Sequence, residues 1–283
     1  MNRLNKPLFA QFWRQMIRRP FWIRIVSFAL TLVLLWLPIG LSIYFLWGEG
    51  GAASFVNMGL LYLIFILLLR VWGRRVHQQR SPLVFYGLKG GWNFGRDALL
   101  GWLAGVFLVA LLFLIEGLLG WVTWQGLPDR FGLLLLDGVL TGVAVGFAEE
   151  LLFRGWLLQE LELEYQPWFA LVLNGLIFAA LHYLHPLEVI LATWPQFFGL
   201  ALLGWILGLS KWIFGGRLGF PMGLHGGLVW AYFGVNVGKL VSYTGVAPEW
   251  LTGINGNPIA GLMGVGLLIL VALGLSYRVA TAP

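Results

Sequence analysis

Residues 142–158 read GVAVGFAEELLFRGWLL, and they place Glu149, Glu150 and Arg154 inside a stretch that is otherwise apolar. A charged side chain in hydrocarbon is costly, so such residues usually face a protein interior or a water-filled cavity. Two carboxylates beside one arginine therefore indicate a functional site on a buried helix. A simpler interpretation is that both glutamates only neutralise Arg154 and join helices, but it leaves the cost of the second carboxylate unexplained.

The composition identifies the chain as a polytopic membrane protein. Of its 283 residues, 59% are hydrophobic and 11% are charged, whereas about 25% charged residues is usual in soluble domains. A membrane-spanning helix needs about 20 mostly apolar residues, so we expect an all-α bundle of about eight transmembrane helices. The expected spans are 21–47, 53–71, 98–119, 131–158, 168–185, 188–209, 218–237 and 258–277.

The first twenty residues are expected to lie on the membrane rather than in it. Apolar residues of this segment, such as Leu8, Phe12 and Ile17, fall on one helical face, which is typical of an interfacial amphipathic helix on the cytoplasmic side. The following apolar run, 21–47, is too long for a removable signal sequence. We therefore predict a cytoplasmic interfacial segment at 1–20 and a single transmembrane domain at 21–283.

The formal net charge of +6 fits a membrane protein better than a nucleic-acid-binding one, because the basic residues lie between the apolar segments. There they can contact anionic membrane lipids. A cytoplasmic N-terminus leaves only Arg130 and Lys239 in outer loops, and eight spans then put the C-terminus in the cytoplasm as well. The expected location is a bacterial plasma membrane or an equivalent organelle membrane.

The chain contains no cysteine. This excludes disulfides, thiolate metal ligands and a cysteine nucleophile. It also means that this protein cannot itself be prenylated or palmitoylated.

Five ionisable residues are candidates for one site. Glu150 and Arg154 are one helical turn apart and can pair, while Glu149 lies about 100° further round the helix and can face a cavity. His182 in IFAALHYLHP (177–186) and His225 in GFPMGLHGGLVW (219–230) belong to later spans. Straight helices do not bring these groups to one depth, but continuation of the fourth helix through residue 161 moves Glu149 towards mid-membrane. We expect His185, which abuts Pro186, to be structural.

Glycines spaced four residues apart line several expected spans, and small residues at this spacing let membrane helices approach closely. Plain packing is the simpler interpretation of these stripes, although they lie beside the ionisable residues. They are Gly142 and Gly146, Gly204 and Gly208, and Gly219, Gly223 and Gly227.

Together, three motifs resemble those of the CPBP family, which comprises CAAX-protease and bacteriocin-processing intramembrane endopeptidases and is also called Abi. The motifs are Glu-Glu-x-x-x-Arg at 149–154, Phe-x-x-x-His at 178–182, and a glycine-flanked histidine at 225. The resemblance covers residues from about 131 to 230 and implies a catalytic core at 131–237. It also implies a helical bundle that cleaves peptide bonds near the cytoplasmic leaflet.

The resemblance further implies a role for each residue. Glu149 would be the general base that activates water, His182 would assist it, and His225 would help to hold the oxyanion, with Glu150 and Arg154 as the supporting pair. Family members are often metalloproteases, and Glu149, His182 and His225 offer ligands suited to zinc. A metal-free, glutamate-activated water would use the same residues, so both possibilities stay open.

One position departs from the family pattern, because Val229 stands where an asparagine or aspartate is usual, four residues after His225. This favours a second hypothesis, a non-catalytic membrane scaffold of the same fold. A third is a proton-coupled transporter with Asp137 in a relay. For a protease, the partner would be a membrane-associated peptide or protein, with C-terminal CAAX processing and signal or propeptide trimming as open alternatives.

Overall fold

The computed structural model describes residues 13, 15–48 and 50–281, which divide into two compact units. Unit 1 comprises Met1–Tyr86 and Gln159–Glu164, and unit 2 comprises Gly87–Leu158 and Tyr165–Pro283. The expectation of one transmembrane domain from 21 to 283 stays a prediction.

Unit 1 is built on a pair of long apolar helices, α2 (Phe21–Trp47) and α3 (Gly51–Arg75), followed by the short α4 (Pro82–Phe85). One buried amide joins the pair. Asn57 accepts a hydrogen bond at Oδ1 from Trp36 Nε1 (2.8 Å) and donates from Nδ2 to the carbonyl of Gly40 (3.3 Å). Because hydrocarbon offers no water to an amide, such bonds between helices satisfy the side chain inside the protein.

A buried carboxylate, Glu160 of α7 (Leu158–Glu162), organises the other end of unit 1. It accepts hydrogen bonds from Arg24 Nε (2.7 Å) and Trp72 Nε1 (2.8 Å), and it contacts His77 Nε2 (2.7 Å). Trp13 is buried with its ring edge-to-face against Trp72. The rest of the interfacial segment predicted at 1–20 lies largely outside the described residues.

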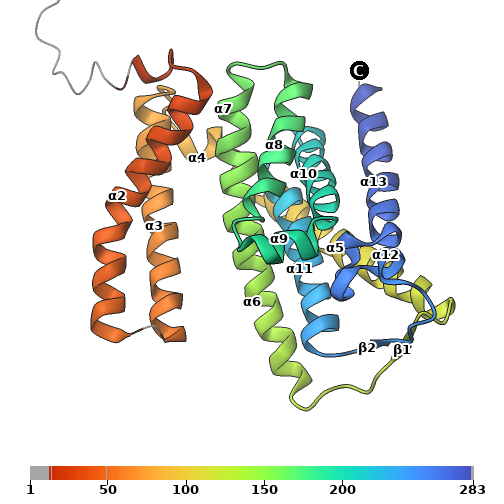
Figure 1. The fold of residues 1–283 in the computed structure, drawn as a ribbon. Helices are drawn as coiled ribbons and strands as arrows, with labels where there is room; N and C mark the ends of the chain where they lie inside the picture. The colour runs from red at the N-terminus through yellow and green to blue at the C-terminus, as the bar shows by residue number, and fades with distance from the viewer. Residues whose placement is uncertain (1–12, 14, 49, 282–283) are drawn as a thin grey trace, which may run out of the picture. The chain divides into compact units, whose positions relative to one another are not determined.

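Unit 2 contains most of the catalytic core that was predicted at 131–237 (Figure 1). A two-stranded antiparallel sheet pairs β1 with β2, with Thr123 opposite Ser242. The elements are α5 (Trp92–Leu118), β1 (Val122–Trp124), α6 (Phe131–Glu150), a π-helical segment (Leu151–Leu157), α8 (Pro167–Leu181), α9 (Leu187–Thr193), α10 (Gln196–Ile213), α11 (Gly219–Val237), β2 (Val241–Tyr243), α12 (Glu249–Thr252), two 3₁₀ turns (Ile254–Gly256 and Pro258–Ala260) and α13 (Leu262–Ala280).

Glycines let α11 approach both α5 and α6. A Cβ atom at Gly223 would lie 1.9 Å from the carbonyl oxygen of Ala98 in α5. One at Gly146 of α6 would lie 2.5 Å from the carbonyl oxygen of Met222 in α11. The predicted role of these stripes in close helix packing is therefore confirmed at both contacts. On another side of unit 2, α10 packs against α8 and α13.

The structure supports an all-α membrane bundle but does not confirm eight spans. In its described part, six helices are long and apolar enough to cross a membrane: Phe21–Trp47, Gly51–Arg75, Trp92–Leu118, Phe131–Glu162, Gln196–Ile213 and Leu262–Ala280. The helix expected to end at 158 continues to Glu162, so the predicted continuation through residue 161 is confirmed.

Three of the expected spans differ from the prediction. The one at 168–185 ends at Leu181 and leaves a 15-residue helix, α8. The one at 188–209 is divided into α9 and α10 by Trp194 and Pro195, because a proline ring clashes with the preceding helical turn. The one at 218–237 is present as α11, but its five glycines lower its mean hydropathy.

Candidate active site

All five candidate residues lie in unit 2, on three helices: α6 with the π-helical segment that continues it, α8 and α11. Glu149 and Glu150 are the last residues of α6, and Arg154 follows within the π-helical segment. His182 is the C-cap residue of α8, whereas the span predicted at 168–185 placed it within the helix. His225 lies in the second turn of α11. Residues far apart in the sequence are thus brought to one place.

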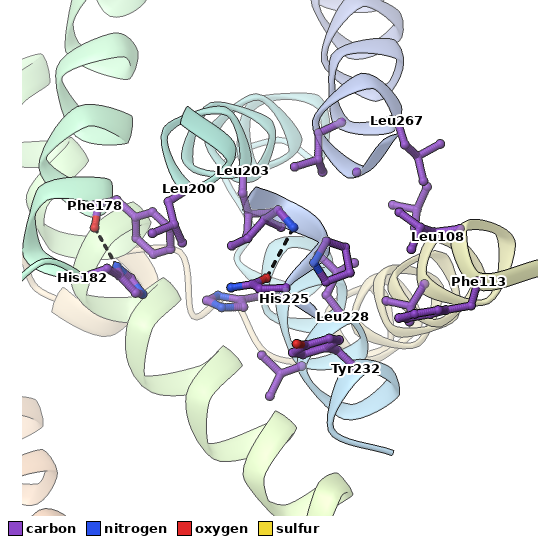
Figure 2. A pocket seen from close by; sticks show the side chains of 18 residues that line it. Leu108, Phe113, Phe178, His182, Leu200, Leu203, His225, Leu228, Tyr232 and Leu267 are labelled. Carbon is purple, nitrogen blue, oxygen red and sulfur yellow. Dashed lines mark hydrogen bonds between the residues drawn. The ribbon is translucent and has the colours of Figure 1, made fainter. Parts of the chain in front are cut away.

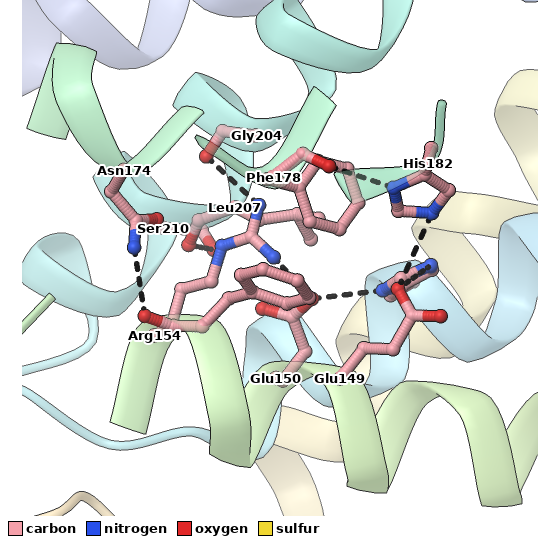
Figure 3. Close-up of polar contacts among 11 residues, drawn as sticks. Glu149, Glu150, Arg154, Asn174, Phe178, His182, Gly204, Leu207 and Ser210 are labelled. Atoms are coloured by element: carbon pink, nitrogen blue, oxygen red, sulfur yellow. Dashed lines mark hydrogen bonds and ion pairs between the residues drawn. The ribbon is translucent and has the colours of Figure 1, made fainter. Parts of the chain in front are cut away.

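Glu149 faces both histidines. Its Oε2 atom is 3.7 Å from Nε2 of His182 and 3.9 Å from Nε2 of His225, and Figure 3 shows the Glu149 carboxylate turned towards His182. Within the described part of the chain, this buried oxygen has no hydrogen-bond partner. Both imidazole Nε2 atoms therefore lie close to the same carboxylate oxygen.

The other ring nitrogen of each histidine is already bonded. Nδ1 of His182 is 2.7 Å from the carbonyl oxygen of Phe178, which can only accept, so this nitrogen carries the proton. Nδ1 of His225 is 2.8 Å from Oε1 of Glu150 and donates to that carboxylate. When either ring is neutral, its Nε2 presents a lone pair towards Glu149. The space between them thus suits a hydrogen-bond donor, such as water, or a cation.

Glu150 and Arg154 form the ion pair that their spacing predicts. Arg154 Nη1 donates to Glu150 Oε1 at 2.9 Å, and both side chains are fully buried. The guanidinium also donates to the carbonyl of Gly204 in α10 (3.1 Å) and lies 4.3 Å from the centre of the Phe178 ring. A buried pair adds little net stability because desolvation offsets its attraction, so its effect here is to orient Glu150, which in turn holds His225.

The donor atoms facing this space have the chemistry that zinc prefers, two imidazole nitrogens and a carboxylate oxygen. Each histidine also donates its other ring proton to a carbonyl or carboxylate, as metal-binding histidines usually do. Ligands of a tetrahedral zinc ion lie about 3.4 Å apart, from metal–ligand distances of about 2.0–2.2 Å, and the two histidine–glutamate separations are a few tenths of an ångström longer. Among the described residues, no group of three or more His, Cys, Asp or Glu side chains has the arrangement that holds a metal ion.

An apolar cavity of about 220 Å³ adjoins the two histidines. In Figure 2, His182 and His225 line one side, while Leu108, Phe113 and Leu267 lie on the other. Val229, one helical turn after His225, also lines this cavity. The position that departs from the family pattern is therefore part of the site's wall and contributes an apolar surface.

Two further residues contact the site, and sequence reasoning did not select them as site residues. Asn174 donates to the carbonyl of Phe153 (2.9 Å), and Lys211 donates to the carbonyl of Arg154 (2.6 Å). Asn174 precedes Phe178 and His182 by four and eight residues, so helical spacing alone could have placed it on the same face. Lys211 is buried, whereas the charge pattern alone would place it on the cytoplasmic surface.

The remaining residues weighed from the sequence lie outside the site. His185 is exposed beyond the end of α8, and Asp137 is exposed on α6, twelve residues before Glu149. That separation is about 18 Å along a helix. Asp137 is therefore too far away to exchange a proton directly with Glu149.

Comparison with protein families agrees with the sequence motifs. Residues 131–231 match the family model described as Type II CAAX prenyl endopeptidase Rce1-like. This interval contains all five candidate residues. The match confirms the resemblance to CAAX proteases, which are hydrolases. Comparisons with curated proteins and with solved structures gave no match.

Proposed function

We propose that the Rce1-like domain at residues 131–231 is an intramembrane endopeptidase, which hydrolyses a peptide bond of a membrane-associated substrate with water activated by Glu149. One observation carries the proposal. The unpartnered Oε2 atom of Glu149 lies 3.7 and 3.9 Å from the Nε2 atoms of two histidines on other helices. A water molecule there can donate to the carboxylate and to one imidazole nitrogen.

The reaction needs a base, an orienting group and a group that stabilises negative charge. Glu149 accepts a proton as the water oxygen bonds to the carbonyl carbon, and the carbonyl π electrons move to oxygen. His182, whose Nδ1 proton is held by the Phe178 carbonyl, accepts a hydrogen bond from the water at Nε2. The oxyanion then re-forms the carbonyl as the carbon–nitrogen bond breaks, and Glu149 returns the proton to the leaving nitrogen, which keeps the bonding pair.

His225 is suited to the developing oxyanion. When its ring is protonated, Nε2 can donate to the oxyanion while Nδ1 keeps its hydrogen bond to the Glu150 carboxylate. Were zinc bound by Glu149, His182 and His225, it would polarise the substrate carbonyl and acidify the bound water. The same three side chains serve either form of the reaction.

The wall of the cavity indicates the kind of substrate. Apart from the histidines, the residues that line the cavity are mostly apolar. Burial of an apolar group there contributes about 25 cal/mol per Å² to the free energy of binding. This suits a peptide that carries a lipid or a hydrophobic segment. The family description favours C-terminal processing of a prenylated CAAX peptide, with trimming of signal peptides or propeptides as the alternative.

The test is turnover by purified protein in liposomes, with a fluorescence-quenched farnesylated CAAX peptide and the same peptide without farnesyl as probes. Glu149→Ala should lower the rate by about 10²–10⁴-fold, which is the usual contribution of a general base. Asp137→Asn, an exposed carboxylate on the same helix, is the matched control and should cleave like the wild type. Undiminished turnover in Glu149→Ala would overturn the proposal.

The scaffold hypothesis keeps one observation in its favour, the apolar Val229 in the cavity wall. Val229 cannot donate a hydrogen bond to an oxyanion, and loss of one such donor lowers the rate of catalysis by about 10²–10³-fold. If the protein is a scaffold, Glu149→Ala should leave its cellular phenotype intact, whereas bulky residues at Gly223 or Gly227 should abolish it. A phenotype lost in Glu149→Ala variants that fold normally would exclude this hypothesis.

A further inference from the structure

The helix that carries the site widens into seven residues of π-helix directly after Glu150. In this form each amide bonds to the carbonyl five residues earlier, as the amide of Leu158 does with the carbonyl of Phe153. Such segments are rare and frequently mark functional sites. Something must stabilise this one against the ordinary α-helical form.

Two buried side chains from neighbouring helices donate into the π-helical segment at consecutive carbonyls. Nδ2 of Asn174 in α8 is 2.9 Å from the carbonyl oxygen of Phe153, and Nζ of Lys211 in α10 is 2.6 Å from that of Arg154. Both donors are almost completely excluded from solvent. A buried lysine is costly and usually has a function, and here it bonds the main chain of the residue that pairs with Glu150.

Asn174 belongs to the face of α8 that reaches the site. Phe178 and His182 follow it at four-residue intervals, one above the other on a helix. Phe178 contacts the Phe153 ring edge-to-face, with centroids 4.9 Å apart, and contacts the His182 ring at 4.5 Å. A shift of the π-helical segment at Phe153 would therefore reach His182 through the ring of Phe178. Figure 3 shows Phe178 beside His182.

Lys211 donates to the π-helical segment from α10, as Asn174 does from α8. It lies seven residues, or two turns, after Gly204, whose carbonyl accepts from the Arg154 guanidinium. Arg154 is thus bound to the same face of α10 by its side chain at Gly204 and by its main chain at Lys211. Fixing both ends of Arg154 fixes Glu150, and through it His225.

We propose that Asn174 and Lys211 are positioning residues of the candidate active site. By holding the π-helical segment at Phe153 and Arg154, they set the direction of Glu149 and Glu150 relative to His182 and His225. The inference rests on the proposed endopeptidase function, but the stabilisation of the π-helical segment can be measured separately.

The kinetic test compares donor-deleting with donor-retaining variants on the farnesylated peptide. Lys211→Met and Asn174→Leu should lower kcat by about 10–100-fold, because misplacing catalytic groups by about 1 Å can cost 10²-fold, while KM stays within about threefold. Lys211→Arg, which still donates, should keep at least about a third of kcat. Equal losses in Lys211→Arg and Lys211→Met would overturn the proposal.

A matched control separates positioning from general loss of stability. Asn57 in unit 1 is likewise a buried amide that joins two helices, but it lies outside the site. Asn57→Leu should lower the thermal stability without lowering kcat. If it lowers kcat as much as Asn174→Leu at an equal loss of Tm, Asn174 has only a structural role.

Hydrogen exchange gives a readout that does not need cleavage. In detergent, peptides covering residues 151–158 should exchange at least about tenfold faster in Lys211→Met and Asn174→Leu than in the wild type or Asn57→Leu, because the π-helical segment opens more often. Unchanged exchange in both site variants would overturn the proposal. If the wild type cleaves no peptide, the proposed function fails while this measurement still decides the role of the two donors.

Discussion

Glu150 and Arg154 are both fully buried, and each contacts another part of the site: Glu150 holds His225, and Arg154 contacts α10. Removing one partner of a buried ion pair leaves an uncompensated charge, whereas replacing both is much less costly. The pair can therefore be separated experimentally into its structural and its catalytic contributions.

Arg154→Met should destabilise the protein by about 3–5 kcal/mol, as breaking a buried ion pair does. The double variant Glu150→Gln with Arg154→Met should recover most of that loss but not the activity, since His225 then lacks its carboxylate partner. Unfolding in detergent, followed by tryptophan fluorescence, measures the first effect, and peptide turnover measures the second. A double variant as unstable as Arg154→Met would contradict this account of the pair.

The five candidate residues could be selected from the sequence, but their surroundings could not. The four-residue spacing of Glu150 and Arg154, and the cost of charge in a membrane, led to the pair and to Glu149. The π-helical segment and its contacts with Asn174 and Lys211 were not predicted, because they depend on which carbonyls neighbouring helices can reach. Local sequence does not reveal that geometry.

At the scale of elements, the position of His225 depends on how closely α11 can approach α5 and α6. Glycine substitutions on α11 test this contact with an internal control. A Cβ atom at Gly223 would lie 1.9 Å from the Ala98 carbonyl oxygen, whereas one at Gly234 would meet no described residue outside its own stretch of helix within 4 Å.

Gly223→Ala should force α5 and α11 apart, lowering both stability and turnover. Gly234→Ala should leave turnover unchanged and raise stability slightly, by up to about 1 kcal/mol, because alanine is the better helix former. Thermal unfolding and peptide cleavage of the two variants are the measurements. Equal tolerance at both positions would show that the close contact is not needed.

Most helices of the fold were predictable from runs of apolar residues, and the errors have local causes. The span expected at 188–209 contains Pro195, which ends one helix and begins the next. The end of α8 at Leu181 was not apparent from the sequence, because the first helix-breaking residue after it is Pro186. The turn there places His182 at a helix end, with its Nε2 towards Glu149.

At the scale of the whole molecule, the apolar helices and the match of residues 131–231 to a CAAX prenyl endopeptidase family model indicate an integral membrane protein. Its orientation remains a prediction from the distribution of lysine and arginine. The helix α5, with 27 residues, is about 40 Å long and can cross a hydrocarbon core of about 30 Å. Residues at its two ends should therefore face opposite sides of the membrane.

The absence of cysteine from the chain makes this orientation easy to test. Gly90→Cys, before α5, should react with a membrane-impermeant maleimide only from the cytoplasmic side. Ser242→Cys, in the strand paired with β1 after α5, should react only from the opposite side. The unsubstituted chain is the unreactive control, and the reverse labelling pattern would contradict the predicted orientation.

The central claim is that Glu149, His182 and His225 meet around one hydrated position. An experimental density map of the protein in lipid, at a resolution that shows ordered water, tests it most directly. We predict a density peak for water or a metal ion within bonding distance of Glu149 Oε2 and of at least one of the two Nε2 atoms. A map in which these three groups lie apart, or in which Glu149 faces lipid, would contradict the claim.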